Sequence, residues 1–121
     1  PDMRLPIQYA LMYPERRASL TPPLDLTQLG ALTFERPDYK TFRCLALALD
    51  MARIRGTACA VMNAANEAAV SLFLEGRISF SQIYGCVAAA LETIQNNENP
   101  TVAEILDADA EARRIVFEYN G

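Results

Sequence analysis

The sequence predicts a mainly α fold: an antiparallel four-helix bundle preceded by a short helix and an extended, proline-containing linker arm. Two observations lead to this prediction. From residue 42 onward, apolar residues recur at the three- and four-residue spacing of one helix face. Residues 14–41 instead contain four prolines and keep no helical period. Short connections between consecutive amphipathic helices favour antiparallel neighbours. We therefore expect three parts, residues 1–14, 15–41 and 42–121.

Within residues 1–41, the stretch "PDMRLPIQYALMYP" predicts a helix of about two turns that starts at Pro6, because proline suits the first helical position, and that Pro14 ends. "LDLTQLG" predicts one short turn that stops at Gly30, and "ALTFE" predicts either a single strand or an extended arm. The arm is too apolar for a free tether, so we expect it to lie on another surface. Its apolar residues are Leu24, Leu26, Leu29, Leu32 and Phe34.

The first two helices of the bundle are each followed by a glycine, Gly56 and Gly76, which suit helix C-termini. Each helix has one face that we expect to be buried. In the first, that face is Phe42, Leu45, Ala46, Leu49 and Ala52. In the second, it is Ala58, Val61, Met62, Ala65, Ala68, Ala69, Leu72 and Phe73.

The last two helices each begin with a capping-box pattern, Ser79 with Gln82 and Thr101 with Glu104. The expected buried face of the third helix is Ile83, Val87, Ala90, Leu91 and Ile94. That of the fourth is Ile105, Ala108, Ala112, Ile115, Val116 and Tyr119. Charged residues, including an Asp109–Arg113 pair at i,i+4, fill the outer side of the fourth helix, which predicts a solvated face.

Composition excludes several classes of protein. With 121 residues, 51% of them hydrophobic, the chain is long enough for one globular domain with a core. The net charge of −4 argues against partners such as nucleic acid or an anionic membrane. No apolar run reaches the roughly 20 residues of a membrane span, and no signal peptide opens the chain. Since Pro1 stands where an initiator methionine would, we expect the chain to be part of a longer protein.

The cysteines and the lack of histidine further restrict the chemistry. Cys44, Cys59 and Cys86 are an odd number at wide spacing, so we expect reduced thiols in an intracellular protein, with Cys59 and Cys86 in the core. The absence of histidine removes the commonest general base and excludes a Glu-x-x-His di-iron bundle. Without a base, no serine of the chain is expected to be a nucleophile, and no glycine-rich phosphate loop is present.

The stretch "NAANE" places Asn63, Asn66 and Glu67 on a polar stripe beside the apolar face of the second bundle helix. One interpretation is a site for magnesium or manganese, which prefer oxygen ligands. Such a site would want more than one carboxylate, and this stripe has one. The favoured interpretation is structural: the amides satisfy backbone groups of the arm or of a docked domain. No catalytic residue and no metal ligand is predicted.

Three stretches in fixed order resemble a known family. They are "PDMRLPIQYALMYPER", "LDLTQLGALTFERPDY" and "GTACAVMNAANEAAVSLFLEGRISFSQI". Together they resemble the C-terminal portion of the 1-deoxy-D-xylulose 5-phosphate reductoisomerase family, although Cys59 stands where relatives tend to have proline. The resemblance implies a cytoplasmic, homodimeric enzyme of the non-mevalonate isoprenoid pathway. It would convert 1-deoxy-D-xylulose 5-phosphate to 2-C-methyl-D-erythritol 4-phosphate with NADPH and Mg²⁺ or Mn²⁺.

The resemblance also implies roles for parts of this chain. Residues 1–14 would be the end of the central catalytic domain, 15–41 the linker and 42–121 the C-terminal helical domain. Met3 would contact the nicotinamide, with Pro1 and Asp2 less surely involved. The partners would be the N-terminal and central domains. Alone, the segment is expected to be inactive, to bind neither NADPH nor metal, and to self-associate through its first forty residues.

Two other hypotheses fit the residues alone. One is a freestanding helical module that binds a partner protein through the arm and the NAANE stripe. The other is a small metal-binding bundle, which the lack of histidine and of paired carboxylates disfavours.

Overall fold

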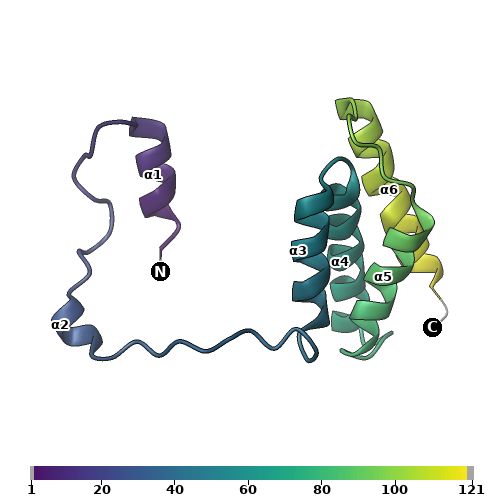
Figure 1. Cartoon of the computed structure of the whole chain (residues 1–121), viewed down its shortest axis with the longest axis horizontal. Coiled ribbons are helices and arrows are strands. Elements are labelled where there is room, and N and C mark those ends of the chain that lie inside the picture. The colour runs from purple at the N-terminus through teal and green to yellow at the C-terminus, as the bar shows by residue number, and fades with distance from the viewer. Residues whose placement is uncertain (1, 120–121) are drawn as a thin grey trace. The chain divides into compact units, whose positions relative to one another are not determined.

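The computed structural model describes residues 2–119, and every regular element among them is a helix (Figure 1). The mainly α class is therefore confirmed. The helices are α1 (Arg4–Met12), α2 (Leu26–Leu29), α3 (Arg43–Ile54), α4 (Ala58–Leu74), α5 (Gln82–Thr93) and α6 (Val102–Glu118). The chain forms two compact units, one ending at Arg36 and one beginning at Pro37.

The first unit contains α1 and α2, and the residues before each helix explain where it begins. Asp2 Oδ1 accepts a hydrogen bond of 2.9 Å from the Arg4 backbone N–H, so α1 begins two residues before Pro6. Proline is tolerated there because the first turn needs no intrahelical N–H bond. At α2, Asp25 Oδ1 accepts from the Thr27 N–H at 2.9 Å, and Gly30, at φ +71°, ends the helix as predicted.

The segment "ALTFE", residues 31–35, forms no strand. Of the two alternatives predicted for it, the extended arm is the one observed. A strand needs a neighbouring strand to satisfy its backbone groups, and residues 2–119 contain none.

The second unit is organised around α4, which packs against α3, α5 and α6 (Figure 1). Four helices do pack together, but α6 packs on α4 and α5 and, within the described residues, not on α3. Because α3 packs on both α4 and α5, α3 and α6 are the one pair among the four described bundle helices that do not meet. The buried core comes from α4, α5 and α6: Val61, Ala64, Ala65, Ala68, Ala69, Leu72, Ile83, Cys86, Val87, Ala90, Ala112 and Val116.

The small side chains of α4 explain its central position, because alanines allow neighbouring helices to approach closely. Most of its predicted face is buried, and Ala64, which was not predicted, is fully buried as well. Phe73 was predicted to be buried but is 37% exposed. It packs at the end of the helix against Phe80, edge to face, with the ring centroids 5.7 Å apart.

The prediction of the buried face of α3 is wrong. Phe42, Leu45 and Leu49 are 62%, 41% and 38% exposed, whereas Leu47 packs on the core. The error has a physical cause: α3 carries apolar residues on two opposite faces, and periodicity does not indicate which face meets the neighbouring helix.

The capping predictions succeed to different degrees. At α6 the complete box is present: Thr101 Oγ1 accepts from the Glu104 N–H, and Glu104 Oε2 accepts from the Thr101 N–H at 2.7 Å. At α5 only half is present. Gln82 Oε1 accepts from the Ser79 N–H at 2.7 Å, but the hydroxyl of Ser79 does not cap a backbone N–H of α5.

The loop between α5 and α6 forms hydrogen bonds with the turn between α3 and α4 and with the start of α4. Asn96 Oδ1 accepts from the Ala58 N–H at 2.9 Å, and so caps α4 from outside the helix. Thr57 and Asn97 exchange two further bonds, each 3.0 Å long. Asn97 also lies so close to Gly56 that a Cβ there would overlap its carbonyl oxygen. These contacts fix the α3–α4 turn to the α5–α6 loop.

Candidate functional site

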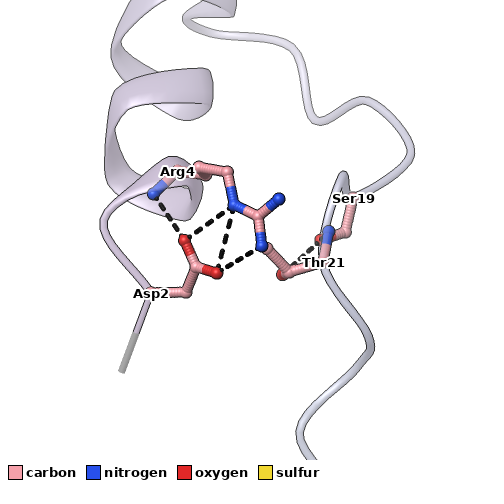
Figure 2. A network of polar contacts seen from close by, with 4 residues as sticks. All are labelled: Asp2, Arg4, Ser19 and Thr21. Atoms are coloured by element: carbon pink, nitrogen blue, oxygen red, sulfur yellow. Dashed lines mark hydrogen bonds and ion pairs between the residues drawn. The ribbon is translucent and has the colours of Figure 1, made fainter.

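Met3, the residue predicted to bind a cofactor, lies immediately before α1 with its side chain 71% exposed. Its two sequence neighbours, Asp2 and Arg4, form an ion pair (Figure 2). Arg4 Nη2 donates to Asp2 Oδ2 at 2.7 Å, and Arg4 Nε lies 3.1 Å from both carboxylate oxygens. The Arg4 backbone N–H is also bonded to Asp2. The Asp2 carboxylate therefore binds both the backbone and the side chain of Arg4.

The ion pair also determines the charge state of this segment. The Arg4 guanidinium, and then the Arg4 backbone N–H, lower the pKa of the Asp2 carboxyl below its usual range. Asp2 in turn raises the pKa of Arg4. Both groups are therefore charged at neutral pH, and their charges cancel beside Met3.

The loop that follows α1 is tied to the helix and carries two hydroxyls. Gln8 Nε2 donates to the Ala18 carbonyl at 2.8 Å. The Ser19 and Thr21 hydroxyls lie 3.0 Å apart, and Figure 2 shows both residues on the loop. Ser19 Oγ also accepts from the Thr21 N–H at 3.1 Å, so these hydroxyls stabilise the turn. Pro1 lies outside the described residues.

Two polar residues of NAANE, Asn63 and Glu67, form hydrogen bonds within the bundle. Asn63 Nδ2 donates to Glu67 Oε1 at 3.2 Å, and Arg113 Nη2 donates to Glu67 Oε2 at 2.6 Å. Arg113 also forms the predicted i,i+4 pair, with Nε 2.8 Å from Asp109 Oδ2. Glu67 thus joins α4 to α6. Sequence reasoning missed this contact, since no local pattern links residues 46 positions apart.

Asn66, the second asparagine of the stripe, lines an apolar groove of about 490 Å³ between α3, α4 and the start of α5. At one end of the groove, the Arg43 guanidinium lies over the Tyr84 ring, 3.5 Å from its centroid. The groove has no acid–base pair and is suited to packing. Its apolar and aromatic lining residues are Phe42, Leu45, Val70, Phe80, Ile83 and Tyr84.

The three cysteines are unpaired, in agreement with the predicted thiols. Cys86 is fully buried as predicted, and its burial raises the pKa of the thiol. The prediction for Cys59 is wrong, because it is exposed. It lies in the first turn of α4 on the side toward α3, where its thiol is 3.4 Å from the Met51 carbonyl oxygen.

Two features are absent from residues 2–119. No three His, Cys, Asp or Glu side chains there gather as metal ligands would. No described helix is long and apolar enough to cross a membrane.

Comparison with known families identifies the chain. The profile of the DXP reductoisomerase C-terminal domain matches residues 1–115. The chain belongs to this family. The resemblance noted in the sequence is thereby confirmed, and the all-helical unit from Pro37 onward is the fold expected of the family's C-terminal domain.

Individual relatives agree with the assignment to the DXP reductoisomerase C-terminal domain family. The 1-deoxy-D-xylulose 5-phosphate reductoisomerase of Aromatoleum aromaticum is 52% identical over 115 residues, covering 95% of this chain and 28% of the relative. That of Caldanaerobacter subterraneus subsp. tengcongensis is 50% identical, covering 98% of this chain and 32% of the relative. The chain therefore spans about 30% of the length of the curated relatives it matches.

Solved structures of the family give the same result. The Zymomonas mobilis enzyme in complex with NADPH superposes with a TM-score of 0.85 at 37% identity, covering 98% of this chain and 31% of that one. A DOX-P reductoisomerase in complex with NADPH, fosmidomycin and magnesium gives a TM-score of 0.80 at 41% identity, with 98% and 31% covered.

Proposed function

We propose that this chain is the C-terminal portion of a reductoisomerase that converts 1-deoxy-D-xylulose 5-phosphate to 2-C-methyl-D-erythritol 4-phosphate in the non-mevalonate isoprenoid pathway. The observation that carries the proposal is identity near 50% along almost the whole chain to reductoisomerases about three times its length. NADPH and a divalent metal would be the cofactors of that enzyme, as in the solved relatives.

Within this enzyme, the chain would have a supporting role. Residues 1–14 would complete the central catalytic domain, residues 15–41 would form the linker, and residues 42–121 would form the helical domain. The exposed apolar face of α3 and the groove beside it support this role, because a large apolar surface normally meets a partner. The described residues offer no ligand set for magnesium, so no metal-binding role is assigned to them.

Met3 would be the chain's contribution to the cofactor site. Its unbranched thioether side chain is exposed and would pack against the nicotinamide ring, for which sulfur–aromatic contacts are suited. One such contact orients a ring without taking part in hydride transfer. Met3 is therefore proposed as a binding residue and not as an acid, a base or a nucleophile.

The other proposed properties follow from the whole enzyme. Its partners would be the N-terminal and central domains and a second copy of the same protein, and it would act in the cytoplasm. Separated from those domains, the chain would be inactive and would self-associate through its first forty residues. Many apolar side chains are exposed there, including Leu11, Leu32 and Phe34 at 78%, 63% and 88%.

A chimera tests the proposal. The matching segment of the Aromatoleum aromaticum enzyme is replaced by this chain, and NADPH oxidation is followed at 340 nm with 1-deoxy-D-xylulose 5-phosphate as substrate. We expect activity that depends on both substrates and on Mg²⁺ or Mn²⁺. The same enzyme truncated before the segment is the control and should be inactive.

A chimera that folds and stays inactive, beside an active parent enzyme, would contradict the proposal. In that case the alternative of a freestanding interaction module would gain support. The isolated chain should bind neither NADPH nor metal, and its self-association is measured separately by light scattering.

A further inference from the structure

We propose that Asp2 and Arg4 are positioning residues that hold Met3 in the orientation in which it meets the nicotinamide of NADPH. The inference rests on the proposed function and goes further, because it gives Asp2 and Arg4 a role that acts through Met3.

The backbone of Met3 is held by bonds on both sides. The carboxylate of Asp2 accepts from the backbone N–H and from the side chain of Arg4, which closes a loop around Met3. The Asp2 carbonyl also accepts from the Leu5 N–H, and the Met3 carbonyl from the Ile7 N–H, both at 3.2 Å. These bonds fix Met3 near helical geometry, at φ −65° and ψ −17°.

The Met3 side chain, in contrast, is 71% exposed. A flexible side chain on a fixed backbone loses less freedom when it binds a ligand than one on a mobile chain end. The ion pair therefore supplies preorganisation. The cancelling charges have a second consequence: the pair favours neither the uncharged nicotinamide ring of NADPH nor the positively charged ring of NADP⁺.

If Asp2 and Arg4 position Met3, substitutions in the chimera described above should change its Kd for NADPH in a particular pattern. Asp2→Asn and Arg4→Gln should each raise the Kd for NADPH, measured by nicotinamide fluorescence, by about 2- to 10-fold, the typical cost of ordering one side chain. Met3→Ala should have an effect of similar size. Because the ion pair acts through Met3, Asp2→Asn should have no further effect in the Met3→Ala background.

The matched control is Asp25→Asn. Asp25 also accepts a hydrogen bond from a backbone N–H two residues ahead, at 2.9 Å, but it caps α2. Asp25→Asn should leave the Kd for NADPH unchanged. The KM for 1-deoxy-D-xylulose 5-phosphate should be unchanged in all of these variants. Arg4→Lys keeps the charge but loses the bidentate contact with the Asp2 carboxylate. It should therefore raise the Kd for NADPH as Arg4→Gln does. If Asp2→Asn does not fold, Arg4→Lys and Arg4→Gln provide the same test.

Three outcomes would overturn the inference. The effects of Asp2→Asn and Met3→Ala could add, Asp2→Asn could leave the Kd unchanged like Asp25→Asn, or Asp2→Asn and Arg4→Gln could shift the Kd in opposite directions. The last outcome would show a charge effect on the cofactor and not positioning. Each of these leaves the unsubstituted chimera active, whereas failure of the proposed function is recognised by an inactive chimera, and the inference falls with it.

Discussion

Arg113 on α6 binds Glu67 on α4 through a hydrogen bond of 2.6 Å between Nη2 and Oε2, across 46 positions of the sequence. The same guanidinium bonds Asp109 on its own helix, while Glu67 also accepts from Asn63. The charged end of "NAANE" is therefore one half of a contact between helices. This explains a carboxylate beside the apolar face of α4 without any catalytic role.

The first prediction concerns this contact and pH. Hydrogen bonds from Arg113, and then from Asn63, lower the pKa of Glu67 below its unfolded value. Ionised Glu67 thus stabilises the fold fully above its unfolded pKa, about 4.3, and this stabilisation is lost as the pH falls through the lower folded-state pKa. Glu67→Gln should lower the Tm at pH 7, and the difference from the unsubstituted chain should disappear in strong acid.

Glu98→Gln is the control for this prediction, because Glu98 is an exposed residue of the α5–α6 loop. Its Tm at pH 7 should equal that of the unsubstituted chain. A Tm difference for Glu67→Gln that stays constant between pH 7 and strong acid would contradict the assigned role. Added salt should reduce the difference, since the pair is partly exposed.

The second prediction tests which face of α3 is packed. Leu47 packs on the core and Leu49 is 38% exposed, so the same change at two nearby positions of one helix should have different effects. Leu47→Ala should lower the free energy of unfolding by about 1–3 kcal/mol, and Leu49→Ala by less than half as much. Urea denaturation followed by circular dichroism measures both. Equal losses would mean that Leu49 is as well packed as Leu47.

The comparison of α3 with α4 explains how far the sequence predicts this fold. On α4 the apolar residues form one wide stripe, so periodicity predicts both the helix and most of its buried face. On α3 it predicts the helix but not the face. The capping box of Thr101 with Glu104 is local and was correctly predicted, whereas that of Ser79 with Gln82 is only half present.

Contacts between distant segments could not be predicted in this way. Neither the bond of Arg113 to Glu67 nor the capping of α4 by Asn96 follows from any local pattern. The candidate site shows the same limit. Met3 was proposed from the family resemblance, whereas the ion pair around it became visible only in the structure.

The third prediction concerns the thiols. Cys59 is exposed, Cys44 is half-buried, and Cys86 is buried with its pKa raised by burial. Because the thiolate is the reactive form, alkylation by N-ethylmaleimide should label Cys59 first, Cys44 more slowly and Cys86 only after denaturation. Peptide mass spectrometry over a time course identifies each site. Labelling of Cys86 as fast as that of Cys59 in the folded protein would contradict the described core.

The fourth prediction compares two glycines that both have a positive φ. Gly56 and Gly76 have φ of +62° and +73°, which costs any other residue about 1–2 kcal/mol. At Gly76 an added Cβ would meet nothing within 4 Å, so Gly76→Ala should cost only that conformational strain. At Gly56 the Cβ would overlap the Asn97 carbonyl and lie 2.8 Å from Asn96 Oδ1. Gly56→Ala should therefore push the α5–α6 loop away from the start of α4 and lower the free energy of unfolding by much more than Gly76→Ala does.

Amide hydrogen exchange shows where the effect occurs. The Ala58 N–H should lose protection in Gly56→Ala and keep it in Gly76→Ala, because Asn96 Oδ1 accepts its hydrogen bond. Equal destabilisation of the two variants, with Ala58 still protected, would mean that the contacts between the α3–α4 turn and the α5–α6 loop do not stabilise the bundle.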